Sequence, residues 1–272
     1  MKLSNIFLST LAVLLCCTAC SKDEESFKGK DADASLSIAV KAVGSAVTKG
    51  FHPNDENELA GEAKVNNLSV LVFDESGAQL IGYGWQATNS EGEASILNVP
   101  AMTMRAQIVI VSNTPENSLA GVTSYSDFES KLAQLADQFQ SNLVMSSPVI
   151  TTQAPLVKGD NYLGYASMGS ENINGIAEPV EITRLAARLD LVNVKTDFTK
   201  TLLRNRTVRV EEVTILNQSA ASRFFSRDYW GVVMATGHLG NSDATALNRD
   251  IANGSPINDT PYVHYVMEND GS

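Results

Sequence analysis

Residues 35–50 hold the pattern that most constrains the fold of this chain, because apolar and polar side chains alternate along the first part of it. In an extended segment this alternation makes one face apolar and the other small or polar. The apolar face consists of Leu36, Ile38 and Val40, and Val43 continues the apolar character; these four residues are the predicted latch of the strand. A polar run that follows Lys49 makes this basic residue accessible to a protease. The pattern predicts a strand that proteolysis can remove; the alternative is an ordinary first strand followed by an ordinary loop.

The start of the chain has the features of a secretory leader with a lipid-attachment site. Residues 6–15 are mostly apolar and follow Lys2, and the run is too short to span a bilayer as a permanent helix. Small residues directly precede Cys20, as a lipoprotein signal peptidase requires, so we predict that Cys20 is lipidated. Cys17 is a weaker acceptor, and plain secretory cleavage near Ala19 is the other interpretation.

Composition narrows the classes of function. All three cysteines lie in the leader, so the remaining chain offers no disulfide and no thiolate ligand. The histidines lie far apart in sequence, and we predict no metal site, no cofactor and no catalytic residue; they are His52, His238 and His264. The formal charge of −11 and the expected lack of Lys and Arg clusters argue against nucleic acid or an anionic membrane surface as a partner.

The hydrophobic pattern predicts an all-β chain with one or two short helices. Residues 65–73 are nearly continuous in apolar side chains, so we expect a central strand that is buried on both faces. Further strands are predicted at residues 78–85, 95–99, 105–111, 148–157, 180–184, 186–195, 207–217 and 262–267. One helix is predicted, with Ser126 as its cap and an apolar stripe formed by Phe128, Leu132, Leu135 and Phe139.

Several blocks occur in an order that is informative when they are taken together. They are LSVLVFD at 68–74, IVIVSNT at 108–114, NYLGY at 161–165, VEITRLAARL at 180–189 and YVHYVMEND at 262–270. Together they resemble the fimbrillins, the major fimbrial subunits that build type V pili in Bacteroidia-type bacteria. The resemblance runs in order from the lipid-attachment site to the last residue.

The resemblance implies two transthyretin-like β-sandwich domains. We expect a signal peptide at 1–20, a tether and removable strand at 21–49, an N-terminal sandwich at 50–178 and a C-terminal sandwich at 179–272. Fimbrillins continue well past the last of the blocks above, so we expect the second sandwich to be incomplete at its C-terminus.

The resemblance also implies a route of assembly. A lipoprotein precursor is carried to the outer membrane surface, and a trypsin-like protease then cuts between Lys49 and Gly50. Lys49 stands where the best-known members have Arg, and Lys41 is a poorer candidate because it lies within the alternating strand. Loss of the strand opens a groove for the next subunit, which gives a head-to-tail homopolymer that supports adhesion. A receptor on a host or bacterial surface stays open as a further partner.

Two other functions stay open. One is a monomeric surface lipoprotein that binds glycans, for which Trp85, Tyr229 and Trp230 are aromatic candidates. The other is an accessory or tip fimbrial protein that does not itself polymerise. Trypsin treatment of the precursor separates these functions from a polymerising subunit.

Overall fold

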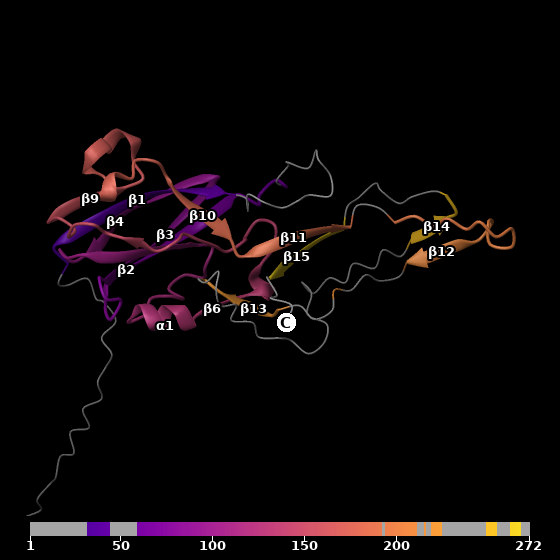
Figure 1. Cartoon of the computed structure of the whole chain (residues 1–272), viewed down its shortest axis with the longest axis horizontal. Helices are drawn as coiled ribbons and strands as arrows, with labels where there is room; N and C mark the ends of the chain where they lie inside the picture. Colours follow the sequence, from indigo (N-terminus) through magenta and orange to yellow (C-terminus); the bar gives the residue numbers. More distant parts are fainter. Residues whose placement is uncertain are drawn as a thin grey trace, which may run out of the picture.

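The structure is a computed structural model in which β-strands dominate (Figure 1). It describes residues 32–43, 59–191, 194–210, 215, 219–224, 249–254 and 262–267. One short α-helix and three short 3-10 helices accompany the strands; they are α1 (Tyr125–Ser130), η1 (Leu135–Asp137), η2 (Ala166–Glu171) and η3 (Ile173–Gly175). Within these ranges no helix is long and apolar enough to cross a membrane.

Nine strands form one large sheet that closes on itself. They are β1 (Ala34–Val43), β2 (Lys64–Asp74), β3 (Leu80–Glu91), β4 (Glu93–Ala101), β5 (Ala106–Ser112), β7 (Met145–Ser146), β8 (Ile150–Thr151), β9 (Gly159–Leu163) and β10 (Val180–Arg184). The order is β10-β7-β5-β2-β3-β4-β1, and β1 pairs back with β10, so the sheet resembles a barrel. β9 pairs with β1, and β8 pairs with β5.

Strand β2 explains the continuous apolar run in the sequence. It lies between β3 and β5, and residues 68–73 are buried without exception. Alternate side chains of β2 and β5 join two different hydrophobic clusters. Val70, Val72, Ile108 and Ile110 belong to one cluster, and Leu71, Phe73, Val109 and Val111 belong to the other. Because both faces of these strands are buried, apolar residues fill every position from 70 to 73 and from 108 to 111, and the prediction of a central strand is confirmed.

The two clusters have different neighbours. The cluster that contains Val70 and Ile108, which we call the inner cluster, also contains side chains of β1, β4 and β10. The other cluster, which we call the outer cluster, includes Phe128 of α1, Leu135 of η1 and Tyr265 of β15. The segment between β5 and β7 and elements that follow β10 therefore pack on the outer face of the sheet.

The predicted helix is much shorter than its apolar stripe suggested. Ser124, and not Ser126, caps α1: its Oγ accepts a hydrogen bond from Asp127 N at 3.1 Å. The helix ends at Ser130, because the next residues form β6 (Leu132–Gln134), which pairs with β13 (Ala221–Arg223). Pairing with a distant strand overrides the local helical pattern, and Phe139 is 51% exposed.

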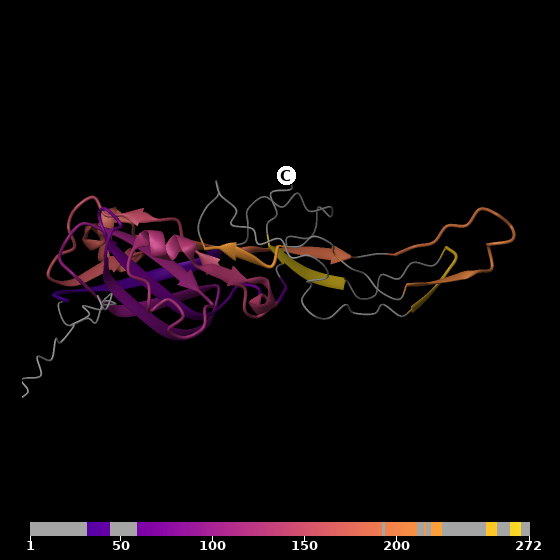
Figure 2. The same ribbon diagram turned by 90° about the horizontal axis from the view of Figure 1, so that it is seen from below.

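The remaining described strands form pairs. β11 (Ala186–Leu191) pairs with β15 (Tyr262–Met267), and β12 (Thr207–Val210) pairs with β14 (Arg249–Ala252). In both ribbon views the β12–β14 pair lies at the end of the long axis opposite β9 (Figures 1 and 2). β10 belongs to the large sheet, although we predicted that the second domain starts at residue 179; the domain division itself stays a prediction.

Candidate functional site: the seat of strand β1

Strand β1 is the element that closes the large sheet. One of its edges pairs antiparallel with β4, from Ala34↔Ala101 to Lys41↔Glu93. The other edge pairs parallel with β9 through residue 38 and with β10 from residue 40. We call the surface formed by β4, β9 and β10 around β1 the β1 seat. A chain without β1 would leave backbone N–H and C=O groups of these three strands unpaired.

The predicted apolar face of β1 points into the inner core. Leu36, Ile38 and Val40 are fully buried, whereas Val43 at the end of the strand is half-buried. Burial of each full side chain stabilises by about 1.5–3 kcal/mol relative to exposure. The structure thus brings three of the four predicted residues together in the core, and near the end of the strand Ala42, not Val43, belongs to this cluster.

Polar side chains hold the start of β1. Asp33 Oδ1 accepts a hydrogen bond from Thr103 N at 2.8 Å, and Ser35 Oγ donates to Asp160 Oδ1 at 2.6 Å. Asn161 Nδ2 donates to the carbonyl oxygen of Ser35 at 3.1 Å. Hydrogen bonds from the Thr103 side chain and backbone lower the pKa of Asp33. These bonds fix the register of β1 in its seat, because each one joins a specific pair of residues.

The neighbour of β1 changes at Ala39, where β9 gives way to β10. Gly164 lies beside this point with a φ of +85°. A Cβ atom on Gly164 would lie 2.7 Å from the carbonyl oxygen of Ala39, which is too close for any side chain. Glycine at position 164 therefore allows the chain to leave β9 in contact with β1.

The residues of the predicted lipid attachment and cleavage lie outside the described part of the chain. These are Cys20, Lys49 and Gly50. Lys49 falls between the end of β1 at Val43 and residue 59, where the description resumes. Both modifications stay predictions.

A buried ionic cluster next to the β1 seat is not evident in the sequence pattern. The carboxylate of Glu62 is 2.8 Å from Arg188 Nη1 and accepts a hydrogen bond from Tyr265 Oη at 2.7 Å. Burial, followed by the hydrogen bond to Glu62, raises the pKa of Tyr265. Arg184 Nε donates to the backbone carbonyl of Glu62 at 3.0 Å. The cluster joins the turn before β2 to β11 and β15, and only tertiary structure brings these residues together.

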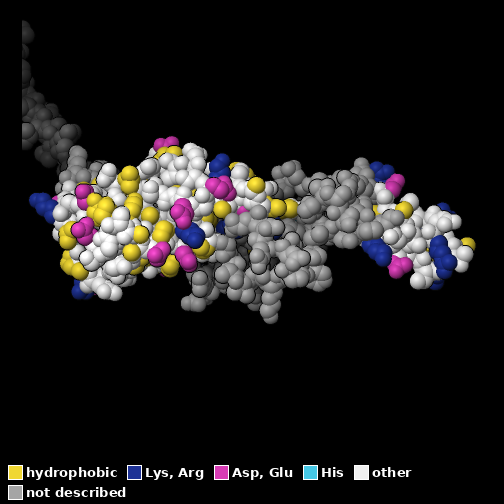
Figure 3. Space-filling model, turned by 90° about the horizontal axis from the view of Figure 1, so that it is seen from above, with side chains coloured by type: hydrophobic (Ala, Val, Ile, Leu, Met, Phe, Trp, Pro, Cys, Tyr) yellow, Lys and Arg dark blue, Asp and Glu magenta, His cyan; other side chains and the backbone are white. Residues whose placement is uncertain are grey.

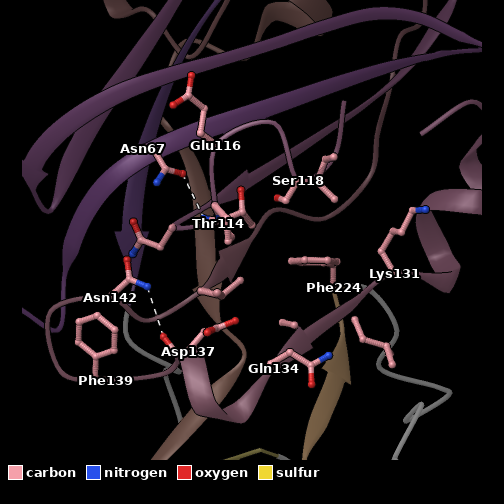
Figure 4. A pocket seen from close by; sticks show the side chains of 16 residues that line it. Asn67, Thr114, Glu116, Ser118, Lys131, Gln134, Asp137, Phe139, Asn142 and Phe224 are labelled. Carbon is pink, nitrogen blue, oxygen red and sulfur yellow. Dashed lines mark hydrogen bonds between the residues drawn. The ribbon is translucent and has the colours of Figure 1, made fainter. Parts of the chain in front are cut away.

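A hollow of about 410 Å³ opens beside β6 (Figure 4). Amide and carboxylate side chains line it together with aromatic rings: Asn67, Glu116, Gln134, Asp137, Phe139, Asn142 and Phe224. Asn67 Oδ1 accepts a hydrogen bond from Thr114 N at 3.1 Å, and Asn142 Nδ2 donates to the Asp137 carbonyl at 3.3 Å. Trp85 does not line this hollow, and residues 229 and 230 are not among those described.

No group of three or more His, Cys, Asp or Glu side chains could hold a metal ion in the described part of the chain. His264 is buried in β15, and the other two histidines are not described.

Two family models match consecutive parts of the chain. Residues 34–184 match the major fimbrial subunit protein (FimA), and residues 185–272 match the C-terminal domain of the Fim1C-like fimbrium tip subunit. The two matches meet where β10 ends.

Individual relatives agree with these matches. The candidate fimbrium tip subunit Fim1C of Parabacteroides distasonis is 46% identical over 270 residues, which are 98% of this chain and 71% of the relative. The major fimbrium subunit FimA type-2 of Porphyromonas gingivalis is 27% identical over 286 residues, covering 98% of this chain and 68% of the relative.

Solved structures show the same fold. The crystal structure of a candidate cell adhesion protein from Parabacteroides distasonis has a TM-score of 0.77 at 45% identity, covering 89% of this chain and 72% of that one. A fimbrilin from Porphyromonas gingivalis has a TM-score of 0.56 at 19% identity, covering 89% and 68%, and supports the fold alone. The predicted resemblance is confirmed: the chain belongs to the family of fimbrial subunits, which form cell-surface appendages.

Proposed function

We propose that this chain is a fimbrial tip subunit that joins its neighbour by strand exchange in the β1 seat and supports adhesion. It is exported as a lipoprotein anchored through Cys20 in the outer membrane. A trypsin-like protease cuts between Lys49 and Gly50, β1 leaves its seat, and a strand of the next fimbrial subunit takes its place. The same cut separates the subunit from its lipid, because Cys20 stays on the removed piece.

The observation that carries this proposal is the position of β1 within the sheet. β1 lies between β4 and β10, and its three inward apolar side chains are fully buried. Loss of β1 would expose both an apolar groove and unpaired strand edges, and an incoming strand satisfies both. A head-to-tail contact of this kind does not close on itself, so repeated exchange generates a filament.

Covalent linkage explains why the precursor stays inactive. While β1 is attached, it competes for its seat at a high effective concentration, and a strand from another molecule cannot displace it easily. Cleavage after Lys49 removes this advantage. The incoming strand then needs only to match the buried apolar face and the backbone pairing of β1.

The tip position is supported by the C-terminal half of the chain. Residues 185–272 match a tip-subunit domain, and the 46% identical relative is a candidate tip subunit. The subunit at the end of a head-to-tail filament contacts only one neighbour, so it needs only one joining surface. In this proposal the β1 seat is that surface. Within this proposal, the chain forms two transthyretin-like sandwiches.

Limited proteolysis tests the exchange. Purified precursor treated with trypsin should lose the segment before Gly50, as mass spectrometry would show, and then form SDS-resistant complexes with fimbrial subunits. Lys49→Gln should block both events, and Lys41→Gln serves as the matched control because Lys41 lies within β1. A cut chain that loses β1 and still forms no complex would contradict strand exchange.

Immunogold labelling of intact fimbriae tests the tip position separately. We expect label at the free ends. Regular labelling along the filaments would instead assign the chain to the shaft.

The hollow beside β6 favours a second candidate function, the binding of a saccharide by a monomeric surface protein. Its amides and carboxylates offer hydrogen bonds, and the exposed ring of Phe139 offers an apolar surface for a sugar. Glycan-array binding that Phe139→Ser removes and Leu97→Ser leaves intact would support it, since Leu97 is exposed to a similar extent elsewhere. Array binding that is unaffected by Phe139→Ser would exclude this hollow.

A further inference from the structure

The chain contains one strongly cationic segment that the overall charge conceals. Residues 195–209 carry five of the 20 Lys and Arg residues and a single acidic residue, Asp197, in a chain with a net charge of −11. The expectation from the sequence that Lys and Arg clusters are absent is therefore wrong. The net charge is a sum over the whole chain, and it does not report where charges gather.

The loop between β11 and β12 places the centre of this segment at the surface. Lys200, Arg204 and Arg206 are all exposed, and none of the three has an ion-pair partner among the described residues. Two backbone hydrogen bonds shape the turn, from Leu203 N to the Lys200 carbonyl and from Arg206 N to the Leu203 carbonyl, each at 2.9 Å. We call Lys200, Leu202, Leu203, Arg204 and Arg206 the cationic tip.

Two leucines lie between these cations. Leu202 is 88% exposed, the largest exposed fraction of any large hydrophobic side chain in the described ranges, and Leu203 is 40% exposed. Single exposed leucines are common on protein surfaces. An adjacent pair at a turn, enclosed by three cations, is a more specific arrangement, because it combines an apolar contact with a charged one.

Contacts with Asn253, the residue that follows β14, hold the base of the loop. Phe198 N donates to Asn253 Oδ1 at 2.6 Å, and Asn253 Nδ2 donates to the Phe198 carbonyl at 3.3 Å. The β12–β14 pair lies at one end of the long axis (Figure 1), and cationic side chains are visible at the same end in the space-filling view (Figure 3). The tip is therefore presented away from the large sheet.

We propose that the cationic tip binds the surface of an anionic phospholipid bilayer, with Leu202 and Leu203 inserted below the headgroups and the three cations on the phosphates. Apolar side chains that enter the acyl boundary and cations that meet anionic headgroups are the two contributions to interfacial binding. A soluble polyanion would use the cations alone and would leave the leucines in water. The leucine pair therefore favours a bilayer over an anionic polysaccharide.

The local charge of this segment makes the contact compatible with the negative net charge of the chain. Electrostatic interactions are screened over about 8–10 Å at physiological ionic strength. Asp197 is the single acidic residue within residues 195–209, so a bilayer at the cationic tip meets mainly positive charges along this segment. This inference goes beyond the proposed function and does not depend on strand exchange, because the β1 seat and the cationic tip share no residue.

Vesicle sedimentation tests the contact. The chain from Ser21 onward removes the leader and any lipid on Cys20, and the described structure begins only at residue 32. We expect binding to vesicles of phosphatidylcholine with one-third phosphatidylglycerol, weaker binding to phosphatidylcholine alone, and loss of binding as salt rises. Equal binding to both vesicles would overturn the proposal.

Variants separate the two contributions. Each cation near an anionic surface changes partitioning by about fivefold, so the combined change Lys200→Gln, Arg204→Gln and Arg206→Gln should weaken binding by about a hundredfold. Leu202→Ser with Leu203→Ser should weaken it by about tenfold. Leu97→Ser with Val157→Ser is the matched control, since both side chains are exposed on the large-sheet region, and it should bind as the parent does.

A fluorescent reporter measures insertion directly. The chain from Ser21 has no cysteine, so Leu202→Cys gives a unique site for an environment-sensitive dye, and Val157→Cys gives the control site. We expect a blue shift with anionic vesicles at position 202 and none at position 157. If soluble heparin competes fully and position 202 shows no shift, the tip binds polyanions and the bilayer proposal is wrong.

Discussion

The large sheet and the β12–β14 pair differ in how much side-chain burial supports each strand. Strands β2 and β5 are buried on both faces, and β1 closes the ring between β4 and β10. In the β12–β14 pair, Ile251 is the one buried side chain among those described, and Arg209 and Asp250 are exposed. A two-stranded pair without a hydrophobic face is marginally stable on its own. Backbone pairing alone is therefore a weak source of stability, and burial decides which region stays folded.

Hydrogen exchange should show this difference most strongly. Amides of β2 and β5 should exchange only through global unfolding, whereas those of β12 and β14 should exchange through local opening. We expect a difference of at least about 3 kcal/mol in the free energy of opening, which mass spectrometry of peptic fragments can measure. Equal protection in both regions would show that the chain unfolds as one unit.

Ile38→Ala should weaken the large sheet selectively. Ile38 is fully buried in β1, and removal of its side chain should cost about 3 kcal/mol in the free energy of unfolding. Urea denaturation measures the loss, and amide protection of β12 should stay unchanged. Lys41→Ala is the control, because Lys41 is exposed on the same strand, and it should change stability by less than about 0.5 kcal/mol.

Glu62→Gln tests the link between the large sheet and the β11–β15 pair. The substitution removes the buried carboxylate that lies 2.8 Å from Arg188 Nη1, so we expect a loss of about 2–3 kcal/mol. Amides of β11 and β15 should lose protection together, because both strands contact Glu62 through Arg188 and Tyr265.

Glu75→Gln is the matched control for this change. It removes a carboxylate from the exposed pair with Arg105 at 3.1 Å, which should cost less than about 1 kcal/mol. If the two substitutions lower the free energy of unfolding equally, the buried cluster does not hold the β11–β15 pair to the large sheet.

Gly164→Ala should loosen β1 in its seat. The new Cβ would meet the Ala39 carbonyl at 2.7 Å, and the residue also has a positive φ. We expect a cost of about 2 kcal/mol or more and faster loss of β1 after trypsin treatment. Gly159→Ala has a similar φ of +89° with nothing within 4 Å, so it should cost only about 1 kcal/mol. The difference between the two variants isolates the contact with β1.

The smallest effect should come from Asp33. Hydrogen bonds from Thr103 lower its pKa in the folded chain, so their stabilising contribution is present above the unfolded value of 3.8 and is lost as pH falls through the lower folded value. Amide exchange in β1 should accelerate across this acidic range. Asp33→Asn should lose most of this pH dependence; an unchanged dependence would assign it to other carboxylates.

Part of this fold follows from local pattern. The alternation of residues 36–40 predicts a strand with one buried face, and the continuous run at 65–73 predicts a strand with two. The strand predicted at 262–267 also matches β15. The helix predicted from Phe128 to Phe139 fails, since β6 pairs with β13 about 90 residues away and the local spacing contains no sign of that pairing.

Some features of the candidate site likewise follow from the sequence, and others depend on tertiary structure. The sequence by itself determined the apolar face of β1, because side-chain alternation in a strand depends only on backbone geometry. It also contained the cationic segment at 195–209, which a scan of local charge would have found. Tertiary structure alone decided that β1 closes the sheet, that Gly164 lies against Ala39 and that Glu62 meets Arg188 and Tyr265. Those contacts join residues more than 100 positions apart, and their free energy depends on the packing of the whole sheet, which no local pattern encodes.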